Sequence, residues 1–455
     1  MKEHNAPDIL PFPHIDKIVE GIFSNFTNDY PNLDTSTCFS DVHASLTHWH
    51  QLDHQQAQPF LPDPTQQPVQ IDLGIESLKR STLATFEANS FDQFMKYKRG
   101  YIYNAGMSVW GLEFAPKTTC LDTDPATHYF AVGGYRQARS YQPLYTPDNA
   151  HPNCIQLVRC QLNTQNEQIP PILDLCLVHE HGHVRELKWC PYGAYEETIN
   201  SEDPTHLPKL GLLACCFGDG SVRVLAVPHP KALRRHLGIN DDAQPIYLQI
   251  KHSSGYLSCN GIPATTIAWA NPSKLAIGHL TGAISVWNVI DALAHPDGSD
   301  VQRSIRFLQH CSAVHDAAVT CISWCGQDNA VAYVSCGFDC RGMATNITDP
   351  MIPMLIYRVR FPPYSVLYSD RRKDVFYQDA DYVVRQMCLL DCQELKSGQL
   401  YGDNKTVVLS MDESPCHTFF STGAADGFVK IHNIYIPKRI RGGVSFFFGS
   451  QGDRQ

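Results

Sequence analysis

The sequence predicts an all-β fold in which small antiparallel sheets recur along the chain and close into a ring, a β-propeller. Three observations lead to this prediction. One segment sets out three strands and a tight turn in order, the same pattern returns several times, and its later copies follow one another at nearly constant spacing.

The clearest repeat lies between His181 and Pro230. We expect strands at 184–189, 212–217 and 221–227, with an Asp219-Gly220 turn between the last two. An Asp-Gly pair between alternating apolar residues is a strong hairpin signal, because the turn requires positive φ. This unit is therefore interpreted as three strands of one sheet.

The first strand of this unit recurs. It carries an apolar residue followed three and five positions later by an apolar and an aromatic residue. The copies are Val109, Leu112 and Phe114; Val184, Leu187 and Trp189; Ala264, Ile267 and Trp269; and Val319, Ile322 and Trp324, with weaker ones at Val366 and Tyr368 and at Leu409 and Met411. The turn position is Asp219, Thr281, Asp339, Asp381 and Asp426 in successive copies.

The last three turn positions are about forty residues apart, which is the period of WD-type propellers. The first two intervals between first strands, from Val109 to Val184 and from Val184 to Ala264, are about eighty residues, which indicates long insertions in blades of the same kind. Six blades are readable, and a seventh is expected from the chain ends. The strand for ring closure is 100–106, pairing with the segment that starts at Phe428, because only a closed ring removes exposed sheet edges.

We therefore divide the chain into an N-terminal extension at 1–95, the propeller at 96–440 and a C-terminal tail at 441–455. In the extension, apolar residues between Ile15 and Phe26 have helical spacing and predict a short amphipathic helix, which packs either on the propeller or on another protein. Segment 49–70 is rich in Gln and Pro and is expected to be a linker.

Composition limits the class of protein. The 455 residues are 43% hydrophobic and 18% charged, as in globular proteins. The apolar runs are too short to cross a bilayer and the first residues do not resemble a secretory signal, so we expect an intracellular protein with reduced, mostly buried cysteines and no membrane association. The net charge of −10 argues against strong autonomous DNA binding, which normally requires a basic surface.

Two groups of residues have the composition of metal sites. His179, His181 and His183 alternate, and three cysteine pairs, CISWC, CGFDC and CLLDC, have three intervening residues. Zinc knuckles usually have two intervening residues in loops, and Gly182-His183 stands where WD repeats place a structural Gly-His pair. We favour structural roles and expect no metal and no cofactor.

Motifs for nucleophilic catalysis or phosphate binding are absent from the sequence. Repetition of an aspartate in successive turns favours a role in each blade over a single acid-base site. We therefore predict a protein that is not an enzyme and takes no small-molecule substrate. Its structural blade residues are expected to be His183, Trp189, Asp219, Trp269, Trp324, Asp339 and Asp426.

Clustered basic residues flank the two proposed closing strands. They are Lys96, Lys98 and Arg99 before the first, and Lys438, Arg439 and Arg441 after the second. If the strands pair, these six residues form one patch that could contact a phosphate backbone or a partner. Ordinary solvated loops are the alternative.

Three stretches resemble a particular family. They are SVWGLEFAP at 108–116, HGHVRELKWCPYGAYE at 181–196, and, after an insertion, LGLLACCFGDGSVRVLAVPHP at 210–230. In this order they are similar to the WD-repeat subunit of transcription factor IIIC, and the Pro-His-Pro ending is not general to WD repeats.

The resemblance implies a noncatalytic nuclear scaffold for RNA polymerase III transcription. Its partners would be the largest, DNA-binding subunit and a second propeller subunit, with DNA reached through the complex at the internal promoters of tRNA genes. The alternative is another intracellular WD-repeat adaptor. That alternative predicts an aromatic and acidic pocket around the central channel.

Overall fold

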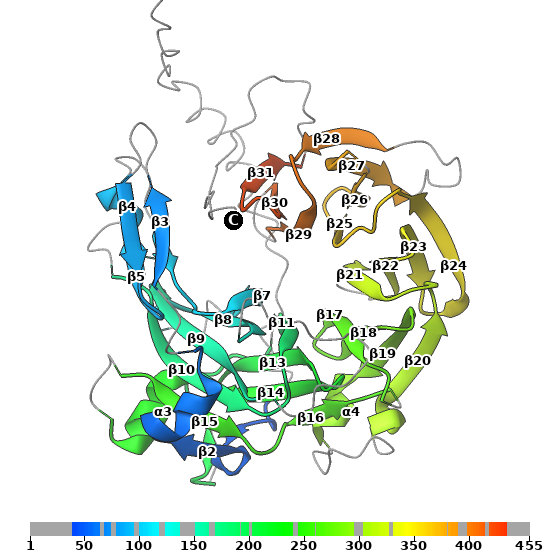
Figure 1. Ribbon diagram of the computed structural model, residues 1–455. Coiled ribbons are helices and arrows are strands. Elements are labelled where there is room, and N and C mark those ends of the chain that lie inside the picture. The colour runs from blue at the N-terminus through cyan, green and yellow to red at the C-terminus, as the bar shows by residue number, and fades with distance from the viewer. Residues whose placement is uncertain are drawn as a thin grey trace, which may run out of the picture.

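The computed structural model describes residues 39–63, 68–73, 79–94, 100–117, 123–136, 151–162, 169–191, 193–199, 203–239, 244–259, 261–294, 304–326, 331–379, 381–389, 398–414 and 418–434. Within these residues, antiparallel sheets follow one another around a central channel, each with its first strand on the inside (Figure 1). The predicted all-β WD-type propeller is confirmed.

The described residues form six blades. Blade 1 contains β7 (Ser108–Phe114), β8 (Thr127–Tyr135), β9 (Asn153–Gln161) and β10 (Ile172–His179); blade 2 contains β11 (Val184–Trp189), β13 (Lys209–Phe217), β14 (Val222–Pro228) and β16 (Gly255–Leu257). Blade 3 contains β17 (Ala264–Asn271), β18 (Lys274–His279), β19 (Ala283–Asn288) and β20 (Leu308–Ala313); blade 4 contains β21 (Val319–Cys325), β22 (Ala332–Gly337), β23 (Arg341–Asn346) and β24 (Asp349–Arg358). Blade 5 contains β25 (Val366–Ser369), β26 (Asp374–Gln378), β27 (Val383–Cys388) and β28 (Gln399–Asp403), and blade 6 contains β29 (Val408–Glu413), β30 (Phe419–Ala424) and β31 (Val429–Asn433).

The inner strands of consecutive blades are joined by a repeated hydrogen bond. The indole Nε1 of Trp189 donates to the carbonyl oxygen of Glu113 over 3.2 Å. Trp269 donates to Lys188 over 3.1 Å, and Trp324 donates to Ala268 over 2.9 Å. Each tryptophan thus bonds to the residue that precedes the aromatic position of the blade before it. At Trp189, Trp269 and Trp324, the recurring aromatic residue found in the sequence is therefore an inter-blade contact.

Blade 1 is wider than the others because two further strands extend its outer edge. Strand β15 (Ile246–Ile250) pairs in parallel with β10, and β2 (Trp49–Leu52) pairs antiparallel with β15. Trp49 is buried in the main core. The expected linker at 49–70 is therefore not a loosely packed segment at its start, because its Trp side chain and backbone find partners on the sheet.

Short elements complete the described fold. A two-residue strand, β1 (Ala44–Ser45), pairs with β12 (His206–Leu207) in the inserted segment of blade 2, and β3 (Val69–Leu73) pairs with β4 (Lys79–Leu83). The α-helices are α2 (His54–Ala57), α3 (Pro230–Leu237) and α4 (Val289–Ala294), and the 3₁₀ helices are η1 (Leu46–His48), η2 (Gln58–Phe60), η3 (Phe91–Gln93) and η4 (Ile305–Phe307). His229 caps α3, with Nδ1 3.3 Å from the Lys231 amide nitrogen, so the Pro-His-Pro sequence begins a helix.

A buried ion pair attaches the extension to blade 2. The ammonium of Lys209, which is fully buried, contacts the carboxylate of Glu196 and donates to the Phe39 carbonyl oxygen over 3.0 Å. Burial lowers the pKa of Lys209, and Glu196 opposes that shift. A buried charge of this kind is retained only when it is paired and hydrogen-bonded, so the segment at Phe39 is held at a defined place.

The predicted closing strand does not pair as expected. Strand β6 (Tyr101–Tyr103) pairs with β5 (Ala88–Ser90), and β31 pairs with β30. The pairing predicted between 100–106 and the segment after Phe428 is therefore wrong for the described residues. The physical reason is that β5 is a hairpin partner nearer to β6 in the chain. Backbone hydrogen bonds of Asn104 with Phe86 and Glu87 hold the two strands together.

Several other predictions remain as they were made. The amphipathic helix expected between Ile15 and Phe26 lies outside the described residues, and the domain division stays a prediction. In the part of the chain that the structure describes, every cysteine is a free thiol, and a helix long and apolar enough to cross a membrane is not found.

The inter-blade tryptophans should dominate stability. Trp189→Ala removes a buried ring and its hydrogen bond to Glu113, so we expect a loss of roughly 3–5 kcal/mol in the free energy of unfolding. Phe361→Ala, at an exposed aromatic residue, is the control and should cost about 0.5 kcal/mol or less. Urea denaturation followed by circular dichroism measures both variants. Equal destabilisation by the two would contradict an inter-blade role for Trp189.

Candidate functional site

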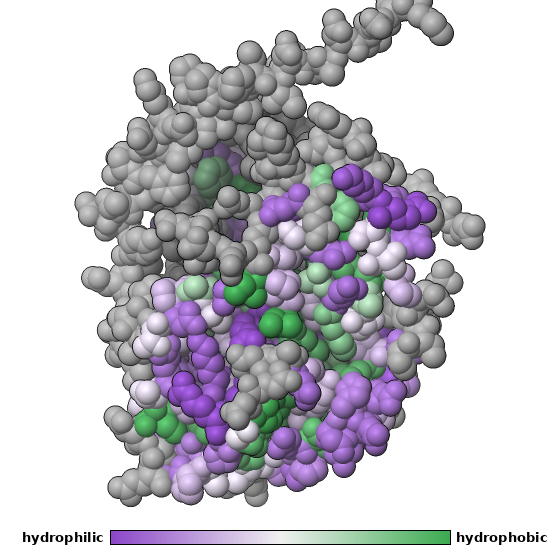
Figure 2. Space-filling view, turned by 90° about the vertical axis from the view of Figure 1, so that its left-hand side faces the viewer, coloured by the Kyte–Doolittle hydropathy of each residue, from purple (hydrophilic) through white to green (hydrophobic). Residues whose placement is uncertain are grey.

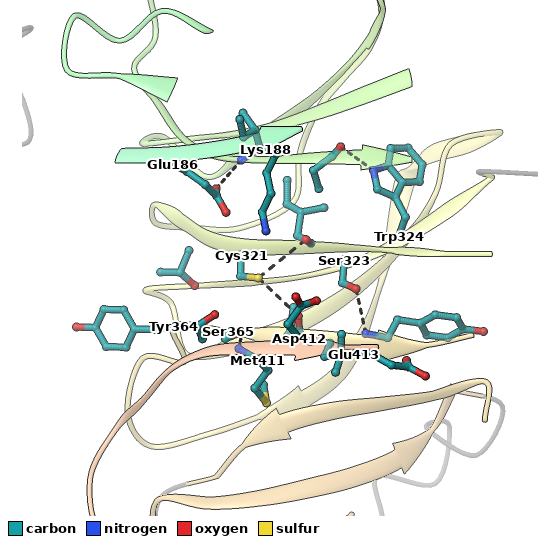
Figure 3. A pocket seen from close by; sticks show the side chains of 18 of the residues that line it. Glu186, Lys188, Cys321, Ser323, Trp324, Tyr364, Ser365, Met411, Asp412 and Glu413 are labelled. Atoms are coloured by element: carbon teal, nitrogen blue, oxygen red, sulfur yellow. Dashed lines mark hydrogen bonds between the residues drawn. The ribbon is translucent and has the colours of Figure 1, made fainter. Parts of the chain in front are cut away.

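The central channel is the candidate functional site. It is a cavity of about 1680 Å³ lined by the inner strands of all six blades. Figure 3 shows Glu186 and Lys188 on β11, Cys321 and Ser323 on β21, and Asp412 and Glu413 on β29 around this space. The inner strands position these side chains because alternate residues of a strand point to opposite faces.

Charged groups from three blades meet in the channel. The Lys188 ammonium lies 3.7 Å from a Glu113 carboxylate oxygen, and Glu186 and Asp412 also act on it electrostatically. Burial alone would lower the pKa of Lys188, but the surrounding carboxylates raise it above its ordinary value. Lys188 therefore stays charged and neutralises only part of the carboxylate charge around it.

Burial changes the pKa values of the channel acids. Burial raises the pKa of Glu113 to about 7, against the opposing effects of Lys188 and a hydrogen bond from the Trp189 amide. Burial also raises the pKa of Glu186, whose carboxylate accepts from the Ile267 amide over 2.8 Å. A nearby cation stabilises the charged form of an acid whose pKa burial has raised. The channel therefore favours cationic groups.

A second acidic group lies at the β29 side of the channel. Burial raises the pKa of Glu413 to about 7, although the Ser369 hydroxyl donates to it over 3.0 Å and Arg371 Nε lies 3.9 Å away. Cys321 is close to the charged cluster, and burial raises the pKa of its thiol. A thiol that stays protonated is a poor nucleophile. The arrangement suits binding better than covalent chemistry.

A repeated β-bulge places one residue of each of five inner strands at the same end of the channel. The register shifts fall at equivalent positions of β7, β11, β17, β21 and β29. Bulges re-aim side chains, and the residues presented to the channel are Trp110, Arg185, Thr265, Thr320 and Leu409. Tyr364 also lines the cavity. Aromatic and arginine side chains of this kind are typical of binding surfaces.

The histidines of the 179–183 segment lie within the blades. His183 stacks on Tyr135 with ring centroids 4.3 Å apart and bonds to Arg185 Nε over 3.0 Å. His181 Nδ1 is 3.7 Å from an Asp219 carboxylate oxygen. Burial lowers the pKa of His181 and His183 to about 4, so both are neutral. Among the residues that the structure describes, a group of metal-ligating side chains is not found.

The repeated aspartates lie in turns. Asp219 accepts from the Ser221 amide over 2.9 Å and from Arg223 over 3.1 Å. Asp339 lies 3.0 Å from His315 Nδ1, and Asp426 accepts from the Phe428 amide over 3.1 Å. Each carboxylate thus stabilises its own turn. These aspartates are distinct from the acids that line the channel.

The six residues of the predicted basic patch, Lys96, Lys98, Arg99, Lys438, Arg439 and Arg441, all lie outside the described residues. The channel residues Glu113, Glu186 and Lys188 were not selected by sequence reasoning. The sequence pattern that could have identified them is a charged residue between the apolar residues of a strand, as in GLEF and RELKW. That signal does not say that the charges meet.

Known proteins are similar to this chain. The family described as WD domain, G-beta repeat matches residues 395–433, which contain β28 to β31. The chain is 22% identical over 342 residues to transcription factor tau subunit sfc6 of Schizosaccharomyces pombe, covering 74% of this chain and 50% of that protein. It is 25% identical over 335 residues to general transcription factor 3C polypeptide 2 of Homo sapiens, covering 67% of this chain and 34% of that protein.

These similarities confirm the resemblance to the WD-repeat subunit of transcription factor IIIC. The chain spans half the length of the fission yeast relative and about a third of the human one.

The channel acids should make stability depend on pH. The folded-state pKa of Glu113, about 7, exceeds the ordinary value of 4.5, so the folded protein binds the extra proton between these values. The contribution of Glu113 is therefore present below about pH 4.5 and is lost as pH rises toward 7. Glu113→Gln should lessen the fall in melting temperature over this range.

Glu180→Gln is the matched control, because Glu180 is an exposed glutamate next to blade 2. Thermal melting of the wild type and both variants at several pH values measures the difference. A Glu113→Gln variant whose pH profile follows that of the wild type would show that Glu113 is not an important titrating group.

Proposed function

We propose, from this similarity to transcription factor IIIC subunits, that the chain is a noncatalytic scaffold subunit of that factor. In this role it supports recognition of the internal promoters of tRNA genes and recruitment for RNA polymerase III transcription, in the nucleus. Its partners are the largest, DNA-binding subunit and a second propeller subunit, and DNA is contacted through the complex. The similarity covers 74% of this chain for the fission yeast protein and 67% for the human one, and this observation carries the proposal.

An exposed apolar strip supports a scaffold role. On β24, the outer strand of blade 4, the side chains of Met351 and Ile352 are 79% and 73% exposed. Met354 and Leu355 follow and are also exposed. Exposed apolar residues gathered on a sheet edge mark protein interaction surfaces, and Pro350 and Pro353 limit edge-to-edge aggregation. We assign this strip to contact with another subunit of the complex.

Purification of the tagged native chain tests both statements. We expect a large subunit to copurify in near-equal amount and the purified complex to restore transcription of a tRNA gene in depleted extract. Met351→Asp together with Ile352→Asp should reduce copurification without lowering the melting temperature, because the residues are exposed. Leu162→Asp, at another exposed apolar residue, is the control.

Recovery of the chain without transcription factor IIIC subunits would refute the proposed function. Unchanged copurification of the double variant would instead reject only the β24 contact.

The basic patch remains a proposal about DNA. If Lys98, Arg99 and Lys438 contact phosphates, their reversal to Glu should lower the affinity of the complex for a tRNA gene. The slope of affinity against salt concentration should also become shallower, because fewer counterions are released. Reversal of Lys79, Lys251 and Lys405, which are exposed elsewhere, changes net charge equally and is the control. DNA titrations at several salt concentrations measure the effect, and equal results for the two triple variants would remove the patch.

One observation favours a second candidate function, a peptide-binding adaptor. The channel carries the aromatic and acidic residues that this alternative predicts, because Trp110 and Tyr364 line the same cavity as Glu113, Glu186 and Asp412. A segment rich in Lys or Arg would complement it. In the same purification, this candidate is favoured if the main copurifying protein is unrelated to transcription factor IIIC and is lost on Trp110→Ala.

A further inference from the structure

Two cysteines from neighbouring blades meet at the outer part of the ring. Cys259 follows β16, the outer strand of blade 2, and Cys311 lies in β20, the outer strand of blade 3. Their thiols share a side-chain hydrogen bond. Figure 1 shows β16 and β20 at the lower right of the ring, away from the left-hand side of the molecule, where Figure 2 shows hydrophobic residues among hydrophilic ones.

The strand register explains why Cys311 points toward blade 2. Cys311 pairs with Ser285 of β19, and residues paired across antiparallel strands project to the same face of the sheet. Ser285 accepts from Trp287 Nε1 over 2.8 Å, and Trp287 belongs to the hydrophobic core that contains the residues of blade 2. The intervening Val286 belongs instead to the core that blade 3 shares with blade 4. The Cys311 side chain is therefore on the blade 2 side of its sheet.

The loop after β16 holds Cys259 on the other side of the contact. The Ser304 hydroxyl donates to the Ser258 carbonyl oxygen over 3.1 Å, and both residues are buried. The segment that leads into β20 is thereby attached to the end of β16. The Cys259 carbonyl oxygen accepts from the Ile262 amide over 2.9 Å. Hydrogen bonds on both sides of Cys259 thus fix its position against blade 3.

Exposure and acidity make this pair reactive. Cys311 is exposed, whereas Cys259 is 8% exposed, so a small reagent reaches the contact from the Cys311 side. The hydrogen bond from Cys311 lowers the pKa of Cys259 to about 7, against the effect of burial. The same hydrogen bond raises the pKa of Cys311. Near neutral pH a thiolate therefore lies beside a thiol, and the thiolate is the nucleophilic form.

A second pair of cysteines shows the effect of complete burial. Cys154 of β9 and Cys176 of β10 also share a hydrogen bond, within blade 1. Both residues are fully buried, and the hydrogen bond together with burial raises the pKa of Cys176 well above its ordinary value. A buried thiol that stays protonated is inert. Contact between two thiols is thus common to both pairs, and access distinguishes Cys259 and Cys311.

We propose that Cys259 and Cys311 form a redox-active dithiol, which a hydroperoxide such as hydrogen peroxide oxidises to a disulfide between blades 2 and 3. The Cys259 thiolate attacks one oxygen of the peroxide, the O–O bond breaks, and the departing hydroxide takes up a proton to give water. Cys259 is then a sulfenic acid. Cys311 attacks the Cys259 sulfur, the S–O bond breaks, and a second water leaves with the Cys311 proton. The two sulfurs together lose the two electrons that the peroxide oxygens gain.

The disulfide would join the outer strands of two blades covalently. An S–S bond of about 2.05 Å forms only between cysteines whose Cβ atoms face each other. The register of β20 and the loop after β16 direct these two side chains toward one another. The inference does not depend on the proposed function, because the chemistry of the pair requires this chain and a peroxide only.

Peroxide treatment of the purified, folded full chain tests the proposal. After an equimolar amount of hydrogen peroxide is added to the reduced protein near neutral pH, remaining thiols are alkylated and the digest is analysed by mass spectrometry. We expect peptides that contain Cys259 and Cys311 to be linked. Cys154 and Cys176 are the internal control and should be recovered as thiols. The same treatment in urea should remove the preference for the Cys259–Cys311 link, because the fold creates it.

Two variants separate the roles of the thiols. Cys311→Ala should leave Cys259 as a sulfenic acid that dimedone traps. It should also move the pH midpoint of Cys259 alkylation upward by about one unit or more, because the hydrogen bond that lowers the pKa is lost. Cys388→Ala, at a partly buried cysteine of blade 5, is the matched control and should change neither the disulfide nor the midpoint.

Three results would each overturn the proposal. They are no link between Cys259 and Cys311 in protein that circular dichroism shows to be folded, an equal yield of this link in urea, and an unchanged alkylation midpoint in Cys311→Ala.

Discussion

The structure depends on the contact between the inner strands of consecutive blades. Each blade is a small sheet whose two faces need partners, and the hydrogen bond from Trp189, Trp269 or Trp324 to the preceding blade aligns one sheet on the next. Because the indole is both large and polar at one edge, the same side chain buries apolar area and sets the position of its neighbour. The stability of a blade is therefore shared with the blades beside it.

This contact also builds the channel. Once the inner strands are aligned, alternate side chains of each strand must point toward a neighbouring blade or into the central space. Glu113, Glu186 and Lys188 come from two adjacent strands, and their charges interact because the inter-blade contact brings those strands together. The bulges near the starts of β7 and β11 then turn Trp110 and Arg185 toward one end of the channel. The electrostatic environment of the channel and its recognition surface thus follow from the packing of the blades.

The N-terminal extension shows how a propeller can be widened without a new domain. Its strand β2 adds to β15, which itself adds to blade 1, and the buried Lys209 and Glu196 pair holds the segment at Phe39. Buried charges contribute little net stability when compared with apolar residues, but they penalise alternative positions. The extension and blades 1 and 2 consequently share one core, and a partner would meet them as one surface.

The sequence by itself determined the all-β repeat fold, because the spacing of Val184, Leu187 and Trp189 and the Asp219-Gly220 turn are local patterns that recur along the chain, at nearly constant spacing in the later copies. It also pointed to the family resemblance, since the Pro-His-Pro ending at 228–230 is local as well. The partner of strand β6 and the burial of Trp49 were decided only by tertiary structure, because pairing and burial depend on residues far away in the chain. The channel charges are the same case: one strand shows that Glu113 is charged, but only the packed ring places it against Lys188, where burial changes its pKa.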